Sequence, residues 1–514
     1  MARQILIKNN LHTLNTAAEA EDNLVLLSTH QDAADKFKVE LWHQRQSIAA
    51  LIKYHLRLPQ SAVCTILPRE SWLQGGFNIC VLVDVTTVDS SKKLIFRCPM
   101  PHMFAEHLYP GTIDEKVSCE VATYIWMHEN CPDIRIPNLF AFGFADGSRF
   151  VHALQTPVYN SLCRKAWQLV YRYLRLPMLS DFVQDLAAPA VNTAYLLLEY
   201  IGPETGKMLS LTWSDYLSDT GRRKNLFGGM ARIMLSLARL PQPHIGSFKF
   251  DTTNCTVTLS NRPLTCSMAI FEQSGTPRVI PPNQLYQNTD SFASDMLTLH
   301  DNHLLYNPHA VRDEEDAQER MALRALLRTV THFFVLPERR NGPYLLQPTD
   351  FHQSNIFVDD EWNITCLIDL EWICALPVEM LSVPYWLTGC SIDEIVDEQY
   401  EPFDKVRKEF LAIMDEELRN VQVEHDVQIT KTMRDTWESK GMWYWACIRS
   451  LNGWLFIVED HILPKFSAIE GLVKDLKQMS SFWQENASRH IEAKVADEKR
   501  YQTELRTLFE DGKF

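Results

Sequence analysis

The sequence predicts a protein of the α+β class, with a strand-rich N-terminal part and a helix-rich C-terminal part. In the N-terminal part, NICVLVDVTT and KLIFRC flank a turn-like VDSSKK, LFAFGFADGSRFVHAL reads as a second hairpin, and YLLLEYI is a continuous apolar run. After Gly202 the apolar residues recur at helical spacing, over about 208–219, 222–240, 289–305 and 313–334. Strands and helices that are separated along the chain in this way are typical of α+β proteins.

Composition restricts the classes of function. The chain has 514 residues, with 50 Lys and Arg against 65 Asp and Glu, which gives a net charge of −15. A hydrophobic content of 46% excludes disorder over the whole chain, because this much apolar surface is enough to build a large core. The acidic balance argues against a broad basic surface for nucleic acid. We therefore expect no nucleic-acid partner. The acidic balance permits cationic small molecules, although a surplus of carboxylates is usually just a soluble surface.

The cysteines and the apolar runs predict a soluble, cytoplasmic protein. The 12 cysteines form no Cys-x-x-Cys pair and no zinc-ligand spacing, and scattered single thiols are typical of a reducing compartment. No run of about 18 apolar residues occurs and the N-terminus has no secretory core, so we expect no membrane partner. The oligomeric state is not predicted.

Three regions follow from the changes in pattern. Residues 1–60 are predicted to be an N-terminal extension, loose over the first 35 or so, followed by a helix that stops before Pro59. Residues 61–201 form the strand-rich region, with an insertion at about 156–190 that fits neither period. Residues 202–514 form the helical region and end in a charged run, 489–507, predicted to be a solvated helix.

A helix is predicted from Thr112, within the strand-rich region. The sequence Thr-Ile-Asp-Glu at 112–115 has the pattern of a capping box, and apolar residues follow on one stripe.

The stretch QPTDFHQSNIFVDDEWNITCLIDLEW carries the strongest chemical signal. It contains Asp350, then Asn355 five residues later, then Asp369 after the next apolar strand. Phosphoryl transfer needs a carboxylate that accepts a hydroxyl proton and oxygen ligands for magnesium. A turn rich in Asp and Asn that only caps backbone groups is the alternative for the first two residues. The second Asp, brought back by a hairpin through Asp359-Asp360, favours the chemical interpretation.

The segment resembles the aminoglycoside phosphotransferase-like, kinase-fold family, especially its fungal phosphotransferase-domain proteins. The resemblance covers about residues 46–403 and includes IGSFKF, LSNRPLTC, RRNGPYLLQ and LIDLEWICALPVEML. It implies a bilobed, protein-kinase-like fold and ATP and Mg²⁺ as cofactors. By the same resemblance Asp350 is the catalytic base, and Asn355 and Asp369 are the magnesium ligands.

Two positions depart from the family pattern. The family usually has a His two residues before the catalytic Asp and often a Gly next to it, where this chain has Pro348 and Thr349. The missing His mainly shapes the loop, so the departure concerns loop geometry more than chemistry. His352 matches the family's downstream His, and a hydrogen bond that braces the loop is the favoured role for it.

The nucleotide-binding residues have weaker signals. Gly75 and Gly76 precede a strand and could form a turn whose backbone approaches phosphates, although paired glycines are more often a plain turn. By the resemblance, Arg97 takes the place of a Lys that contacts the α and β phosphates, and Glu120 is its carboxylate partner. A Glu early in a helix is otherwise a common surface residue.

The connector between the two regions is expected to hold adenine through backbone groups, with Glu199 and Ile201 as the named positions. Glu371 could face a cation or the metal, or it could cap a helix. Two further groups could belong to the acceptor site or be ordinary surface and core: an acidic face of Asp393, Glu394, Asp397 and Glu398, and the aromatic residues Trp443, Trp445 and Trp454.

The sequence therefore predicts an ATP-dependent phosphotransferase that moves the γ-phosphoryl group to a hydroxyl of a small molecule. Two alternatives share the same residues. One is a pseudokinase-type binding or regulatory protein, which the altered Pro348, Thr349 and Arg97 keep open. The other is a protein kinase.

Overall fold

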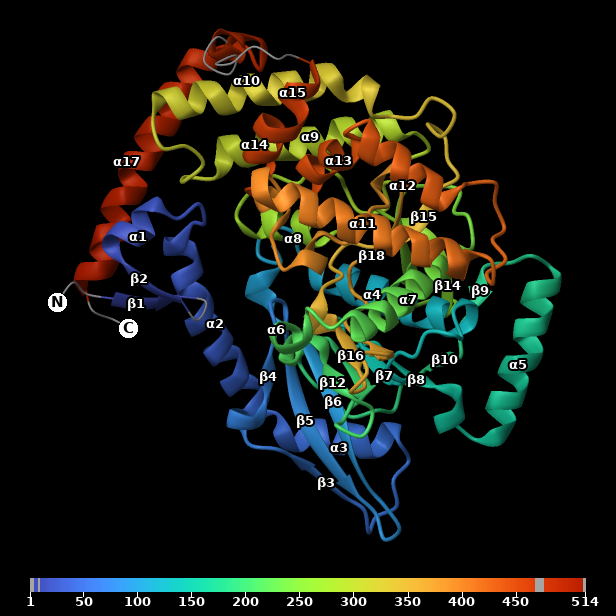
Figure 1. Cartoon of the computed structure of the whole chain (residues 1–514). Helices are drawn as coiled ribbons and strands as arrows, with labels where there is room; N and C mark the ends of the chain where they lie inside the picture. The colour runs from blue at the N-terminus through green and yellow to red at the C-terminus, as the bar shows by residue number, and fades with distance from the viewer. Residues whose placement is uncertain (1–3, 8–9, 467–475, 512–514) are drawn as a thin grey trace.

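A computed structural model describes residues 4–7, 10–466 and 476–511 of the chain. Helices and sheets are both present, with most strands in the N-terminal region and most helices in the C-terminal region, so the predicted mixture of helix and sheet is confirmed. Figure 1 shows the strands of the N-terminal region gathered on one side and the helices of the C-terminal region packed above them. No helix of the described residues has the length and apolarity needed to cross a membrane.

An eight-stranded antiparallel sheet forms the centre of the N-terminal region. Its order is β10-β8-β7-β11-β6-β5-β3, with β4 paired to β5. The predicted hairpins β5–β6 and β7–β8 are confirmed by their pairing. The strands are β3 Val63–Ile66, β4 Leu73–Gln74, β5 Asn78–Thr86, β6 Ser91–Pro99, β7 Leu139–Gly143, β8 Arg149–His152, β10 Phe182–Gln184 and β11 Tyr195–Glu199.

Helices cover both faces of this sheet. One face packs against α3 (Arg45–His55), which lies across the strands in Figure 1, and against α2 (Leu24–His43). Ile79, Val81 and Val83 alternate along β5 toward this face and are fully buried. Burial of each such side chain stabilises the fold by about 1.5–3 kcal/mol. The opposite face packs against α4 (Thr112–Asn130).

The start of α4 corrects the predicted capping box. Thr112 lies inside the helix, and its hydroxyl donates to a backbone carbonyl three residues earlier. The N-cap is Gly111, with a left-handed φ of 93°, and its amide donates to Glu106 at 2.7 Å. Glu115 is buried and bonded to Arg262 at 2.8 Å. A carboxylate from the preceding loop therefore caps this helix instead of its own side chains.

Residues 4–7 and 10–35 are not loose, which corrects the prediction for this part of the chain. They form β1 Gln4–Ile7, β2 Asn10–Thr13, α1 Leu14–Glu19 and the start of α2. These elements pack on the terminal helix α17 (Ala487–Asp511), as Figure 1 shows. Their shared core consists of Ile5, Ile7, Ala17, Leu24, Tyr501, Leu505 and Phe509. The predicted solvated terminal helix therefore has one buried face.

The segment expected as an insertion at about 156–190 contains structure of its own. Helix α5 (Val158–Tyr173) has no buried residue and projects at the edge of the molecule in Figure 1. The next strand, β9 (Met178–Leu179), pairs with β14. Strand β10 then extends the central sheet.

The C-terminal region is mainly helical, as expected. Its helices are α6 Trp213–Tyr216, α7 Thr220–Ala238, α8 Cys266–Gln273, α9 Thr289–Tyr306, α10 Glu314–Val330, α11 Asp397–Leu418, α12 Ile429–Glu438, α13 Gly441–Arg449, α14 Trp454–Ile457 and α15 Leu463–Phe466. The helix predicted over 208–219 is reduced to α6 and a short turn, because Lys207 and Met208 pair with β16 instead.

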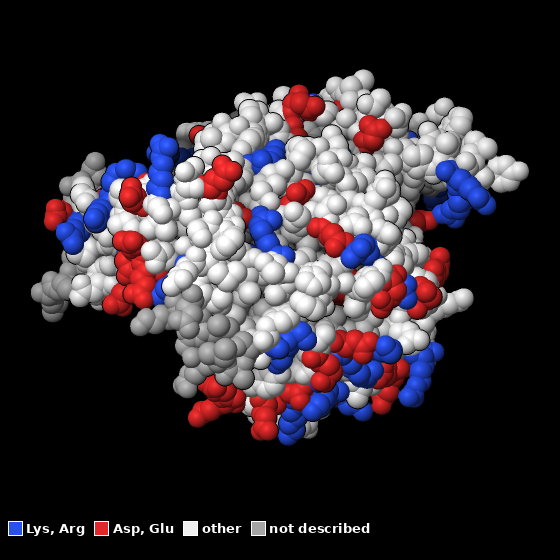
Figure 2. Space-filling view, turned by 90° about the horizontal axis from the view of Figure 1, so that it is seen from above, with Lys and Arg blue, Asp and Glu red and all other residues white. Residues whose placement is uncertain are grey.

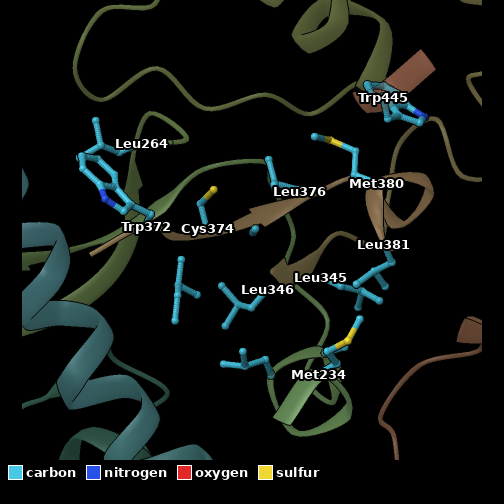
Figure 3. Packing of buried hydrophobic residues seen from close by; sticks show 14 of the residues in the cluster. Met234, Leu264, Leu345, Leu346, Trp372, Cys374, Leu376, Met380, Leu381 and Trp445 are labelled. Atoms are coloured by element: carbon cyan, nitrogen blue, oxygen red, sulfur yellow. The ribbon is translucent and has the colours of Figure 1, made fainter. Parts of the chain in front are cut away.

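Short strands interrupt these helices. They are β12 Lys207–Met208, β13 Ser247–Asp251, β14 Thr256–Asn261, β15 Leu345–Pro348, β16 Ile356–Val358, β17 Ile364–Leu367 and β18 Ile373–Leu376. Figure 3 shows Leu345 and Leu346 of β15 and Cys374 and Leu376 of β18 within the core cluster that also contains Met234 of α7. Trp443, Trp445 and Trp454 are at most 2% exposed, so the core interpretation of these residues is confirmed.

Glu379 is a buried carboxylate in this core. It is 1% exposed, and one oxygen accepts a hydrogen bond from the Leu336 amide at 3.0 Å. Burial raises the pKa of Glu379 to about 7, from an ordinary value of 4.5. The folded state therefore holds this proton more tightly than the unfolded chain. The resulting stabilisation is complete below about pH 4.5 and is lost as the pH rises through about 7.

We expect Glu379→Gln to remove this pH dependence. At about pH 8 the variant should exceed the parent in free energy of unfolding by on the order of 3 kcal/mol, because it buries no charge. Urea unfolding at about pH 5 and about pH 8 measures the difference, with the exposed Glu398→Gln as the control. Equal pH dependence in parent and variant would contradict the assignment.

Candidate active site

The hairpin of β16 and β17 brings Asn355 and Asp369 to the same place. Asn355 directly precedes β16, and Asp369 follows β17 after one residue. The Ile368 amide donates to the Asn355 carbonyl at 2.9 Å, which closes the base of the hairpin. Asp369 has a left-handed φ of 62°, a conformation that Asp tolerates better than most residues. The predicted hairpin is confirmed, and it places both candidate ligands side by side.

The loop that carries Asp350 is held from both ends. Pro348 ends β15, and Thr349 donates to the Trp372 carbonyl through its amide at 2.8 Å and its hydroxyl at 2.9 Å. The Asn355 side chain donates to the Asp350 carbonyl at 2.9 Å. The residues that depart from the family pattern therefore still anchor the loop.

His352 braces the same loop. Its Nδ1 accepts the Ser354 amide at 3.2 Å, as the favoured interpretation predicts, while its Nε2 lies 3.7 Å from Asp350 Oδ1. Burial raises the pKa of Asp350 above its ordinary value. The charge of His352 lowers the pKa of Asp350, whereas the negative charges of Asp369 and Glu371 raise that pKa further. Asp350 is thus a partly buried carboxylate with increased proton affinity, as a general base requires.

Arg97 of β6 reaches this site from the central sheet. Its Nη2 lies 2.5 Å from Asp369 Oδ1 and 3.3 Å from Glu371, and its Nη1 lies 2.9 Å from Glu120 of α4. The predicted pairing of Arg97 with Glu120 is therefore present. Burial alone would lower the pKa of Arg97, but the three carboxylates raise it well above its ordinary value. One guanidinium therefore links the sheet, α4 and the segment after β17.

Lys116 is a second buried cation, which the sequence reasoning did not single out. Its Nζ lies 2.6 Å from Glu120, 2.5 Å from Glu371 and 2.9 Å from the Asn78 side-chain oxygen. Glu371 thus faces cations and caps no helix. The available signal was the i, i+4 spacing of Lys116 and Glu120 on the predicted helix. The partner Glu371 could not be found from local spacing.

Gly75 and Gly76 lie in a three-residue turn between β4 and β5. The Gly75 amide donates to the Asn78 carbonyl at 3.0 Å, and neither glycine has a positive φ. A Cβ on Gly76 would meet no atom within 4 Å, so the turn is open at its tip. Phe77 is buried below it, and the Asn78 side chain donates to Glu371 at 3.0 Å. The turn lies next to the charged cluster, and its contact with phosphates stays a prediction.

Glu199, at the end of β11, and Ile201, in the connector after it, differ in whether their polar groups already have partners. The Glu199 carboxylate is bonded to Arg135 and to Asn138, each at 2.8 Å, so its side chain is committed away from any ligand. The backbone of Ile201 forms no hydrogen bond with a residue that the structure describes. Its side chain joins a small apolar cluster with Phe357, Cys366, Met208 and Ile368. Ile201 therefore offers free backbone groups beside an apolar wall.

Asn355 and Asp369 fit a magnesium ion. The Asn355 amide nitrogen is used by Asp350, which leaves its oxygen free, and the second oxygen of Asp369 has no donor among the described residues. Carboxylate and amide oxygens are ligands that magnesium accepts. Glu120, Asp369 and Glu371 also have oxygens within 4.8 Å of one another. Lys116 and Arg97 already neutralise Glu120 and Glu371, so these two are poor candidates as ligands.

A cavity of about 330 Å³ opens beside Asp350. Its apolar wall includes Met234, Met380 and Leu381, which Figure 3 shows at the edge of the core. Two larger cavities, of about 640 and 690 Å³, lie beside α5 and beside β13 and β14, and Asp350 lines neither. Of these three cavities, the one of about 330 Å³ therefore lies next to the candidate base.

Surface charge is mixed on the face seen in Figure 2. Acidic and basic side chains of the described residues are interspersed there among uncharged ones. This distribution agrees with the acidic net charge of −15 and gives that face no continuous basic area.

No family model matches the chain, and no curated protein matches it. Solved structures give weak similarities. A protein of Ralstonia eutropha JMP134, provisionally assigned as an aminoglycoside phosphotransferase, has 9% identity and a TM-score of 0.39 over 90% of this chain and 98% of its own. An ethanolamine kinase of Plasmodium vivax has 10% identity and a TM-score of 0.35 over 85% of each chain.

A third similar structure is an aminoglycoside phosphotransferase of Alicyclobacillus acidocaldarius subsp. acidocaldarius DSM 446. It has 11% identity and a TM-score of 0.27 over 87% of this chain and 93% of its own. These descriptions agree in kind with the resemblance seen in the sequence, whereas its fungal subset finds no support among them. At such identities and TM-scores the similarities carry no argument about activity, which has to come from the site.

Proposed function

We propose that the protein is an ATP-dependent phosphotransferase that moves the γ-phosphoryl group to a hydroxyl of a small molecule, on a bilobed, protein-kinase-like fold. One observation carries the proposal. A single hairpin juxtaposes Asn355 with Asp369 and holds the Asp350 loop, while Arg97 meets Asp369 from the sheet and is paired with Glu120 of α4. A base, oxygen ligands and a cation for phosphate are the parts that phosphoryl transfer needs.

Each residue then has a defined role. Asp350 accepts the proton of the acceptor hydroxyl, whose oxygen forms a bond to the γ-phosphorus while the bond to the ADP oxygen breaks. Arg97, oriented by Glu120, faces the phosphates with a permanent positive charge. Ile201 offers backbone groups to the adenine of ATP, and the Gly75-Gly76 turn offers amides to its phosphates. Magnesium, when held by Asn355 and Asp369, supplies neutralisation of phosphate charge.

A regulatory, pseudokinase-type protein is the second candidate. It is favoured by the 2.5 Å contact of Arg97 with Asp369, since the guanidinium occupies one oxygen of the candidate metal ligand. A protein kinase is less favoured, because the space beside Asp350 is a cavity of about 330 Å³ lined by core residues. We also place the protein in the cytoplasm, since its 12 cysteines are all free.

Thermal denaturation with ATP and magnesium tests the proposal. We expect ATP with magnesium to raise the Tm of the parent, since a ligand that binds only the folded state stabilises it. Asp369→Ala should abolish the magnesium-dependent part of the rise. The exposed Asp360→Ala, at the tip of the same hairpin, should keep it. A parent without magnesium-dependent stabilisation would contradict the transferase, and ATP binding that ignores magnesium would favour the regulatory protein.

A further inference from the structure

Arg449 is an unpaired cation in the wall of the cavity beside Asp350. It is the last residue of α13 and is only partly exposed. Its guanidinium forms no hydrogen bond and no ion pair with any residue in the described parts of the chain. By contrast, Arg262 in the same region is bonded to both Glu115 and Glu272. A guanidinium taken partly out of water without a partner is costly, so its position calls for an explanation.

Two structural explanations for Arg449 are weak. A cation at a helix C-terminus is favoured by the helix dipole, but Arg449 donates to none of the last carbonyls of α13. A structural arginine would instead pack in a saturated network, as Arg262 does, or stack on an aromatic ring, as Arg324 does on Trp454 at 4.0 Å. The structure gives Arg449 neither arrangement among the described residues. Burial lowers the pKa of Arg449, because the guanidinium is removed from water and no carboxylate compensates for the loss. An arginine nevertheless remains charged at neutral pH.

The charge of the rest of the cavity is nearly neutral. Among the described residues that line it, Asp350 is the only carboxylate, and apart from Arg449 and His352 the others are apolar, aromatic or carry hydroxyl, amide or thiol groups. The acidic face considered as a site for cationic acceptors, Asp393, Glu394, Asp397 and Glu398, does not line the cavity, although the charge of Asp393 acts on Tyr385 of its wall. The Glu394 carboxylate accepts the Ser391 amide at 2.8 Å. Within the described wall, a cationic acceptor would therefore meet Arg449 with Asp350 as the only compensating acid.

Tyr385 connects the two charged residues of the cavity. It lies in the same wall, and burial raises the pKa of its hydroxyl. The charge of Arg449 lowers that pKa, and the charges of Asp350 and Asp393 raise it, so all three groups lie near this ring. An acceptor that spans Tyr385 can thus present one end to the base and the other to the guanidinium.

We propose that the acceptor is a hydroxy acid, an alcohol that also carries a carboxylate, and that Arg449 binds this carboxylate while the hydroxyl meets Asp350. The proposal rests on the proposed transferase function and specifies its substrate class. Arginine presents a planar pair of donors that matches a carboxylate. A phosphate dianion is less suited, because the described residues of this wall supply one permanent cation, Arg449. The acceptor carboxylate is unchanged in the reaction, and Asp350 takes the hydroxyl proton as the new oxygen–phosphorus bond forms.

Binding without nucleotide tests Arg449 independently of phosphoryl transfer. The probes are 4-(hydroxymethyl)benzoate, 3-hydroxybutyrate and glycolate, with 4-(hydroxymethyl)benzamide and 4-(aminomethyl)benzyl alcohol as neutral and cationic counterparts. We expect at least one carboxylate to bind more tightly than both counterparts in NMR titrations. Arg449→Met should weaken that binding about 10- to 100-fold, as expected when a charge-assisted pair is lost. Arg506→Met, an exposed change on α17, should leave it unchanged.

The outcomes separate the two proposals. Tighter binding of the amine or amide, equal carboxylate binding by parent and Arg449→Met, or no carboxylate binding at all would overturn the hydroxy acid assignment. Arg449→Gln and a measured Tm for each variant exclude loss of folding as the cause. Phosphate gain by a carboxylate probe with ATP and magnesium supports both proposals. If carboxylate binding needs Arg449 but the parent shows no stabilisation by magnesium and ATP, the transferase fails while the anion site stands.

Discussion

Replacing Asp350 with asparagine is expected to lower kcat for phosphoryl transfer by about 10²–10⁴-fold, the usual contribution of a general base. Asparagine keeps the size of the side chain and cannot take a proton. The carbonyl that anchors the loop to Asn355 is a backbone group and is retained. Stabilisation by ATP and magnesium should therefore persist in the variant, so that chemistry and not binding is lost.

The pH dependence of the parent gives a second readout of Asp350. Because burial and the nearby acids raise the pKa of Asp350, the rate should rise with pH through a value above the ordinary 3.8 of an aspartate. His352 lowers that pKa, so His352→Gln should move the acid limb to higher pH. Asp360→Asn is the matched control. Parental kcat in Asp350→Asn, or an unshifted limb in His352→Gln, would contradict the assigned base.

The parts of this site that are close in sequence could be predicted. Asp350, Asn355 and Asp369 occupy one continuous stretch, and the alternation of apolar residues around Asp359-Asp360 specifies the hairpin that juxtaposes them. The pairing of Arg97 with Glu120 came from the family resemblance and is present. The antiparallel hairpins of the sheet were equally accessible, because each is formed by neighbouring segments.

The parts that depend on distant segments could not be predicted. Lys116 meets Glu371 only because α4 and the segment after β17 pack together. The side chain of Glu199 turns to Arg135, and a strand pattern contains no signal for that choice. The N-terminal residues look polar, yet they are ordered by the far end of the chain in α17. Arg449 reaches the cavity from α13, and its spacing to Asp350 has no local meaning.

Removal of Lys116 is expected to have the largest effect on stability. Three carboxylates, Glu120, Asp369 and Glu371, share two cations, Arg97 and Lys116, in a buried cluster. Lys116→Met would leave Glu120 and Glu371 with Arg97 alone. The loss of one member of a buried ion pair lowers the free energy of unfolding by about 3–5 kcal/mol. Urea unfolding measures the loss, with the exposed Lys405→Met of α11 as the control.

A double variant distinguishes an unpaired charge from a packing defect. Lys116→Met combined with Glu371→Gln removes a cation and its acid together, so it should be more stable than the sum of the two single losses predicts.

The same variants report on the metal site. Without Lys116, the Glu120 and Glu371 carboxylates have Arg97 as their one cationic partner among the described residues. Arg97 is then held more tightly in the cluster, where it contacts Asp369. If Lys116 is what lets Arg97 release Asp369 for magnesium, Lys116→Met should need more magnesium for the same ATP-induced rise in Tm, and Glu371→Gln should reverse that requirement. An unchanged magnesium requirement in the folded single variant would confine Lys116 to stability and leave Arg97 as the only cation that acts on the metal ligand.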